Sequence, residues 1–268
     1  MSTGRPATRT RFSFSTFNSL QQRDFRWLFV SVLGQMAAIQ MQILMRGWVA
    51  FELTQSFAAI GIVGLASAVP MLTLSMFGGV LADRVSRKSI LLFGHALNLG
   101  FAALTGFLLL VDLLHIEHLI AIALFQGMVQ ALSIPAGQAI IPDVAGKERL
   151  MNAVSLNAAG MSFMRMVAPA IAAFLIALFG PGWAYISIAF FYGFALVALL
   201  PLPMQLAVTQ KVPKDQGIKS GFRDLADGFR YIRAQRIIFW VLVLNFATAI
   251  LAMPYMLILP GYVLSLIH

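Results

Sequence analysis

The chain has 268 residues, of which 60% are hydrophobic and 11% charged, with a net charge of +9 at pH 7 and a mean hydropathy of +0.85. Because no soluble domain needs that much apolar surface, the composition indicates a membrane protein built from several apolar helices. The absence of cysteine excludes a disulfide framework and thiolate metal sites.

The predicted organisation begins with a polar, basic N-terminal tail, residues 1–26. Apolar stretches long enough to span a bilayer follow it, since about 20 residues suffice for a helix to cross. We predict spans at 27–53, 57–82, 89–111, 118–141, 153–179, 183–203 and 237–260. The first six form a unit over 27–203. A polar central loop, 204–236, separates this unit from the seventh span, which lies in 237–268.

Basic residues are segregated between alternate loops. All but two of the 19 Lys and Arg residues lie in the tail, in the turns after the second and fourth spans, and in the central loop. The turns near 54–56, 112–117 and 180–182 hold none. By the positive-inside rule the tail is cytoplasmic. We interpret the positive charge as a topology signal that also suits anionic membrane lipids, and not as a nucleic-acid-binding surface.

Part of the central loop, residues 219–236, predicts an amphipathic helix that lies flat on the cytoplasmic membrane surface. Its apolar residues recur at helical spacing, at Phe222, Leu225, Phe229 and Ile232. A solvated linker whose periodicity arises by chance is the alternative interpretation.

Two arginines fall inside predicted spans. Arg46 lies 19 residues past Trp27, about 28 Å along the helix, so we expect it to snorkel to the outer interface. Arg165 lies about 20 Å into the fifth span, too deep to escape easily at either end. We expect it to face the protein interior, water or an anion. It either binds substrate or only ties helices together through carbonyls and Ser162.

Other polar residues recur at helical spacing within the spans. They are Gln35, Gln42 and Arg46 on the first span, Gln126, Gln130 and Ser133 on the fourth, and Asn245 and Thr248 on the seventh. Such residues either hold helices together or line a shared wet cavity, and both interpretations stay open. The candidate cavity residues are Gln35, Gln42, Arg46, Gln126, Gln130, Arg165 and Asn245. The small residues Gly61, Gly64, Gly78 and Gly79 predict close helix packing.

Catalytic chemistry finds little support in the sequence. No carboxylate lies deep in a predicted span, and His95 is more readily explained as a hydrogen-bonded packing residue than as a proton relay. Neither a nucleophile-base set nor a metal-ligand cluster can be recognised. We therefore predict no enzymatic activity, no metal and no cofactor.

The turn after the second span, "GGVLADRVSRKSI", resembles the loop 2–3 motif of the major facilitator superfamily. The matching residues are Gly79, Asp83, Arg84, Ser86, Arg87 and Lys88, with Ser86 where the superfamily usually has glycine. "APAIAA" is weakly similar to a Gly-Pro-x-x-Gly-Gly motif of superfamily exporters. "RDFRWLFVSVLGQ", "FELTQSFAAIGIV" and "IPDVAGKERLMNAVSLN" resemble the enterobactin-exporter and macrolide-efflux branch, also called transmembrane secretion effectors. The resemblance extends to about residue 262.

The resemblance implies an all-α membrane fold, the N-terminal six-helix half of a major facilitator fold plus a seventh transmembrane helix. It implies proton-driven export of small amphiphilic molecules, such as drugs or siderophores, through a cavity lined by spans 1, 4 and 7. The motif would form a conformational latch. Gly79 permits tight packing, Asp83 meets a helix N-terminus of the second half, and Arg87 pairs with Asp143. Arg84 and Lys88 would meet lipid phosphates.

The superfamily fold needs twelve spans, so we expect the partner of this chain to be the missing C-terminal half of the same protein. The ending "LSLIH" matches what a common transposase sequencing adaptor encodes in one frame. We therefore interpret the chain as a gene fragment. The alternative is a membrane scaffold without transport activity, or a half-size subunit that pairs with a second chain.

Overall fold

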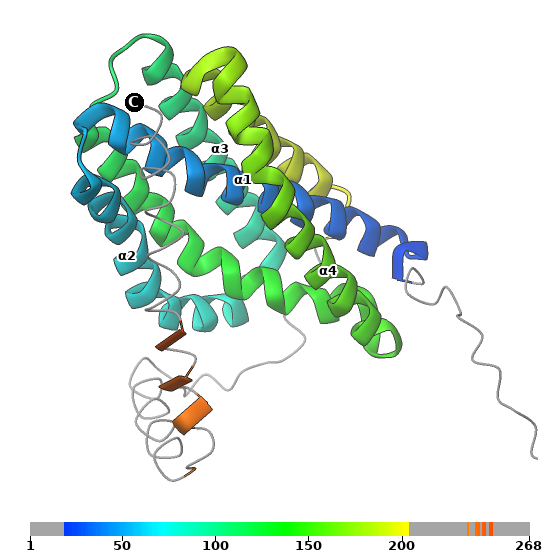
Figure 1. Cartoon of the computed structure of the whole chain (residues 1–268). Coiled ribbons are helices and arrows are strands. Elements are labelled where there is room, and N and C mark those ends of the chain that lie inside the picture. The colour runs from blue at the N-terminus through cyan, green and yellow to red at the C-terminus, as the bar shows by residue number, and fades with distance from the viewer. Residues whose placement is uncertain (1–18, 204–234, 236–238, 242, 245–246, 249–268) are drawn as a thin grey trace, which may run out of the picture.

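A computed structural model describes residues 19–203, 235, 239–241, 243–244 and 247–248. Side chains of 76–84 and 147 also lie outside this description. The helices are α1 (Arg23–Thr54), α2 (Phe57–Arg84), α3 (Arg87–Leu110) and α4 (Ile116–Leu199), and the described residues include no strand (Figure 1). The predicted amphipathic helix and most of the seventh span fall outside the described residues.

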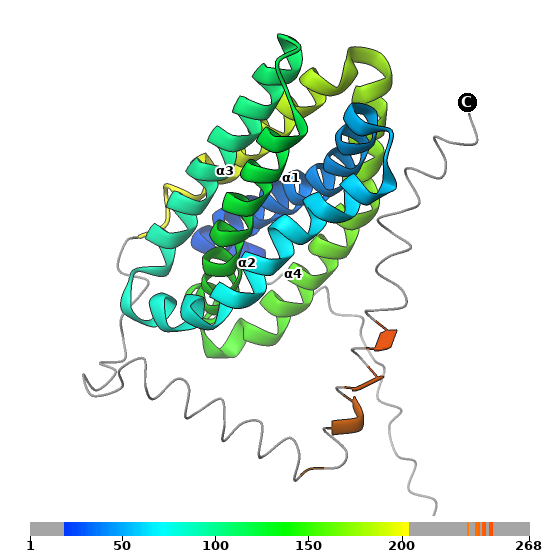
Figure 2. The ribbon, with the colours of Figure 1, turned by 90° about the vertical axis from the view of Figure 1, so that its left-hand side faces the viewer.

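Helix α4 is interrupted at two glycines. Gly146 has φ 70° and ψ 165°, and Gly180 has φ 82° and ψ 171°. L-residues with a side chain rarely adopt such a positive φ, so glycine is needed at both points. The interruptions divide α4 into three helical stretches, and Figure 2 shows the chain turning back on itself within α4.

Five described helical segments are long and apolar enough to cross a membrane. They are Arg23–Thr54, Phe57–Ser75, Arg87–Leu110, Ile116–Gly146 and Glu148–Leu199. The all-helical membrane class is therefore confirmed. The further division of Glu148–Leu199 into two spans stays a prediction.

Ser86 begins α3 as its N-cap. Its Oγ accepts a hydrogen bond from the backbone N–H of Ser89 at 3.1 Å, which satisfies one of the free donors in the first turn. The backbone of Ser86 has φ −56°, a value open to any residue. Serine can therefore stand where the superfamily motif usually has glycine, and here it adds a cap.

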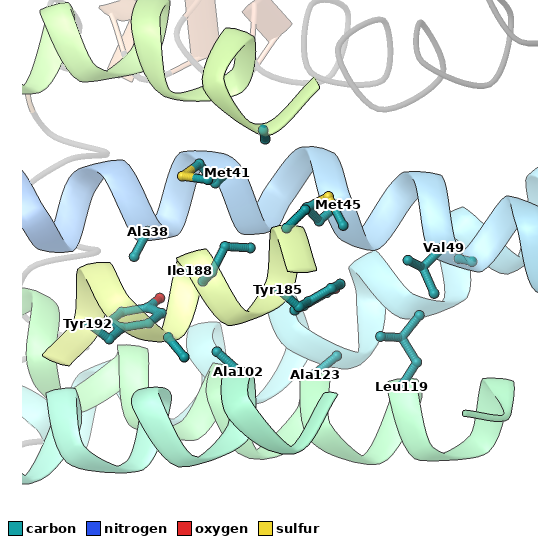
Figure 3. Packing of buried hydrophobic residues seen from close by; sticks show 14 of the residues in the cluster. Ala38, Met41, Met45, Val49, Ala102, Leu119, Ala123, Tyr185, Ile188 and Tyr192 are labelled. Carbon is teal, nitrogen blue, oxygen red and sulfur yellow. The ribbon is translucent and has the colours of Figure 1, made fainter. Parts of the chain in front are cut away.

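Helix α4 packs against α1, α2 and α3 and so organises the bundle. Within the larger apolar cluster, Met41 and Met45 of α1 lie near Tyr185 and Ile188 of α4 (Figure 3). The outer surface is also apolar, and Leu72, Phe93 and Phe190 are 65% to 69% exposed. Apolar side chains on the outside of a helical bundle are expected where lipid, and not water, surrounds the protein. The protein is a multi-pass membrane protein.

The backbones of α2 and α4 approach each other closely at Gly127. A Cβ built at Gly127 would lie 2.2 Å from the carbonyl oxygen of Ser67, so the two backbones leave no room for a side chain. At Gly61 and Gly64 an added Cβ would meet nothing within 4 Å. The predicted close packing at these two glycines is therefore wrong for the described structure, because that face of α2 has no described neighbour.

Replacing Gly127 with alanine should force α2 away from α4. We expect Gly127→Ala to destabilise the folded bundle by about 1–3 kcal/mol, the usual effect of overpacking. Gly61→Ala is the matched control and should leave stability almost unchanged. Thermal unfolding of the purified chain in detergent, followed by circular dichroism, would measure both variants. Equal unfolding temperatures for the two would contradict the packing described here.

Candidate functional site

A cluster of polar side chains lies inside the apolar bundle. Helix α1 contributes Gln42 and Arg46, which are four residues apart and so share a face. Helix α4 contributes Gln126 from its first helical stretch, and Tyr185 and Tyr192 from its last. We call these five residues the polar cluster. It joins three helical stretches that are far apart in the sequence.

Hydrogen bonds connect the members of the polar cluster. Arg46 Nη2 donates to Gln126 Oε1, and Tyr192 Oη donates to Gln42 Oε1 at 3.1 Å. Tyr185 and Tyr192 also lie close enough to Arg46 to interact with it electrostatically. Gln42 is 4% exposed and Gln126 is 1% exposed. Arg46 keeps an intermediate exposure, so the cluster is buried except around its one charged member.

Two donors in the polar cluster have no hydrogen-bond partner within the described part of the chain. They are the hydroxyl of Tyr185 and the Nε2 amide of Gln126. Buried polar groups are nearly always hydrogen-bonded, because an unpaired one costs about 1–3 kcal/mol. Both groups are therefore available to water or to a ligand.

Apolar and small residues surround the two tyrosines. Figure 3 shows Tyr185 and Tyr192 between α1, which carries Ala38 on the facing side, and the helices that carry Ala102 and Ala123. These three alanines are fully buried or nearly so. The polar cluster thus combines a few hydrogen-bonding groups with apolar walls, which is the usual composition of a small-molecule site.

The structure brings together only some of the predicted cavity residues. Gln42, Arg46 and Gln126 belong to the polar cluster, as the stripes on the first and fourth spans suggested. Gln35 and Gln130 are partly buried and make no hydrogen bond to it among the described residues. Asn245 lies outside the described residues. The predicted snorkelling of Arg46 is wrong, because its guanidinium turns inward to Gln126.

Arg165 lies on an exposed face of α4. In the described part of the chain it has neither a hydrogen bond nor an ion-pair partner, and Ser162 is also exposed. The expectation that Arg165 ties helices together through carbonyls and Ser162 is therefore not met by the described residues. A role in binding substrate stays a prediction.

Sequence reasoning did not identify Tyr185 and Tyr192 as site residues. Both lie in an otherwise apolar stretch and count as hydrophobic in its composition. Their spacing of seven residues, two helical turns, is the signal that could have placed both hydroxyls on one face.

An ion pair between Arg87 and Asp143 joins the start of α3 to the first helical stretch of α4. Arg87 Nη1 lies 2.5 Å from Asp143 Oδ2 and donates to the carbonyl of Ala139 at 2.8 Å. The two charged side chains are 24% and 31% exposed, so water reaches the pair. The contact that the resemblance implied between Arg87 and Asp143 is present. An action of this pair as a latch stays a prediction.

Lys88 takes a different position from the predicted one. It is 4% exposed, and its ammonium group donates to the carbonyl of Leu200 at 2.8 Å and to that of Leu202. Carbonyls after the end of a helix lack intrahelical partners and carry partial negative charge. The prediction that Lys88 meets lipid phosphates is wrong, because its charge is used inside the protein to hold α3 against the end of α4.

The remaining motif residues are Gly79, Asp83 and Arg84. Their backbone forms the last turns of α2, and their side chains lie outside the description. The roles implied for them by the resemblance stay predictions.

A cavity of about 770 Å³ lies between α2, α3 and α4. None of the candidate substrate residues is among its described lining residues, which are apolar except for glycine and two serines. Phe93 and Phe125 in its wall are 65% and 51% exposed, so the cavity opens toward the surrounding hydrocarbon. Its lining suits an apolar group such as a lipid chain, and the polar cluster is the better candidate for binding a substrate with polar groups.

A sequence profile described as "transmembrane secretion effector" matches residues 14–268. The chain is 28% identical over 206 residues to the staphyloferrin A transporter of Staphylococcus aureus, which covers 75% of the chain and 50% of that protein. It is 29% identical over 213 residues to the enterobactin exporter EntS of Escherichia coli O127:H6, and this match covers 78% of the chain and 47% of that protein. The enterobactin exporter EntS of Shigella boydii is 30% identical to the chain, also over 213 residues, with the same shares of the two proteins covered. The chain spans about half the length of the curated relatives it matches.

Removal of the Lys88 ammonium group should loosen the attachment of α3 to α4. We expect Lys88→Met to lower the free energy of unfolding by about 1.5–3 kcal/mol, because two charge-assisted hydrogen bonds are lost. Arg23→Met removes an exposed charge and is the control, with little change expected. Chemical unfolding in mixed micelles would compare the two. A Lys88→Met protein as stable as the control would show that the buried ammonium group does not hold the helices together.

Proposed function

Because the chain belongs to the transmembrane secretion effector family of the major facilitator superfamily, we propose that it is part of a secondary transporter that exports small amphiphilic molecules by alternating access. The observation that carries this proposal is the polar cluster in the interior of an apolar membrane bundle. Polar and ionisable residues inside the membrane are rare and commonly mark a substrate or ion path. The family resemblance adds the proton as the proposed coupling ion.

Six crossings within the described bundle would complete one half of the superfamily fold. The segment Glu148–Leu199 has 52 residues, which as a single helix would extend about 78 Å, against a hydrocarbon core of about 30 Å. Gly180 interrupts it with a positive φ at the place where a turn is needed. We therefore propose two crossings there. The Lys and Arg distribution supports a cytoplasmic N-terminus, at a bacterial inner membrane.

The substrates proposed are drugs or siderophores. Among the relatives, the staphyloferrin A transporter and the enterobactin exporter are named for siderophores, which supports this class. Alternating access needs two halves that move against each other around a site at their interface. A second half of the same protein and membrane lipids are therefore the proposed partners.

The Arg87–Asp143 pair is proposed as part of the conformational latch. It joins α3 to α4 with both side chains partly exposed, so it can break and reform as the bundle moves. Asp83, with Gly79 and Arg84 beside it, would supply the contact with the second half. In this proposal Lys88 does not release, because it is buried and holds α3 to the end of α4.

Neutralising Asp143 should impair turnover without preventing folding. The test uses inverted vesicles that contain the protein encoded by the complete reading frame. In these vesicles we expect Asp143→Asn to lower gradient-driven transport of an amphiphilic dye at least about tenfold, which is equivalent to about 1.4 kcal/mol. The exchanged pair Arg87→Asp with Asp143→Arg should recover part of the rate. Asp112→Asn, at the opposite end of the bundle, is the control for removing an exposed carboxylate.

Transport by Asp143→Asn at the wild-type rate would overturn the latch assignment. If wild-type vesicles show no gradient-dependent transport and the protein purifies in a stable complex with a second membrane chain, the alternative of a scaffold or half-size subunit gains instead.

A further inference from the structure

Arg46 is a cation whose partners in the described part of the chain are neutral. Among the described residues it makes no ion pair, its hydrogen bond goes to Gln126 Oε1, and the phenols of Tyr185 and Tyr192 lie within electrostatic range. The sequence has no Asp or Glu in 25–51, 118–142 or 149–199, so the carboxylates of the helical stretches that form the polar cluster all lie at or near the ends of those stretches. Glu52, the next acid along α1, accepts a hydrogen bond from Trp48 Nε1 at 3.1 Å.

The groups around Arg46 without partners are donors. Tyr185 and Gln126 are each 1% exposed, and the Tyr185 hydroxyl and the Gln126 Nε2 amide lack acceptors in the described part of the chain. A positive charge inside apolar surroundings is costly unless an opposite charge meets it. Only an ionised oxyanion would supply both a negative charge and several acceptor sites.

The surroundings of the polar cluster define the rest of the ligand. Met41, Met45 and Ile188 belong to the same apolar cluster as the two tyrosines and are fully buried, and they offer no polar group beyond the thioether sulfurs (Figure 3). Apolar walls of this kind favour a hydrocarbon or aromatic body over a fully hydrated inorganic ion.

We infer that the polar cluster binds an organic anion, whose carboxylate pairs with Arg46 and accepts hydrogen bonds from the Tyr185 hydroxyl and the Gln126 amide. This inference rests on the proposed function and deepens it by naming the charge class of the substrate. A cation of the same size would meet a like charge at Arg46, and a neutral molecule would leave that charge without a negative counter-charge.

A pair of probes with the same shape and different charge tests the inference. Benzoate and its neutral isostere benzamide would each be titrated into the purified chain in detergent at pH 7, with binding followed by isothermal titration calorimetry. We expect benzoate to bind at least about tenfold more tightly than benzamide, since one charge-assisted contact is commonly worth that factor or more. Equal affinity for the two probes, or no binding of benzoate, would overturn the inference.

Substitutions in the polar cluster test whether benzoate binds there. Arg46→Gln should weaken benzoate binding at least about tenfold and leave benzamide unaffected, whereas Arg26→Gln, at an exposed position of the same helix, should leave both unaffected. Tyr185→Phe removes one hydroxyl only and should weaken benzoate by a smaller factor, which keeps the test usable if Arg46→Gln does not fold. Unchanged benzoate affinity in Tyr185→Phe and in folded Arg46→Gln would place the anion elsewhere.

The binding measurement does not depend on a gradient or on movement of the protein. A failure to discriminate benzoate from benzamide would therefore leave the transport proposal standing. Conversely, specific benzoate binding together with no transport in vesicles would overturn the proposed function and keep the anion site.

Discussion

The contact between Arg46 and Gln126 is the interaction around which the interior of this bundle is organised. A charged group inside a membrane protein must meet polar partners or water, because hydrocarbon offers neither. Here α1 supplies the charge and α4 supplies the amide oxygen that meets it. One turn away along α1, Gln42 accepts a hydrogen bond from Tyr192, so polar groups join α1 to both the first and the last stretch of α4. This fixes the rotation of α1 against α4, since turning either helix would leave these groups in hydrocarbon.

The long element α4 makes such an arrangement possible. Its interruptions at Gly146 and Gly180 let it contribute separate stretches to one interior, and its first and last stretches both reach the polar cluster. At the other end of the bundle, Lys88 holds the start of α3 against the residues that follow α4, and Arg87 pairs with Asp143. The neighbouring motif residues Arg87 and Lys88 thus have different physical roles. Lys88 is buried and fixes the packing, whereas the Arg87–Asp143 pair is partly exposed and suited to breaking.

The sequence was sufficient for the helical membrane class, because apolar runs of sufficient length leave few alternatives. It also placed Gln42, Arg46 and Gln126 among the cavity candidates, because polar side chains in apolar spans are conspicuous. Helical spacing shows which residues share a face but not which faces meet, so Gln35 and Gln130 were grouped with residues that the structure keeps apart from them. The position of Lys88 could not be predicted, because its carbonyl partners come from residues more than 100 positions away. The two tyrosines were missed because their rings suit an apolar helix while their hydroxyls act in the cluster.

Binding of an anion at the polar cluster requires that water and small ligands can reach it. The chain contains no cysteine, so a single engineered cysteine would be the sole reactive thiol. Gln126→Cys places that thiol in the polar cluster, and Ile140→Cys places one in an apolar core position that is 0% exposed. The rate of reaction with a small charged methanethiosulfonate reagent in detergent is the most direct measurement. We expect fast modification at position 126, slowed by benzoate, and no modification at position 140. Equally slow modification at both positions would contradict anion binding at the polar cluster.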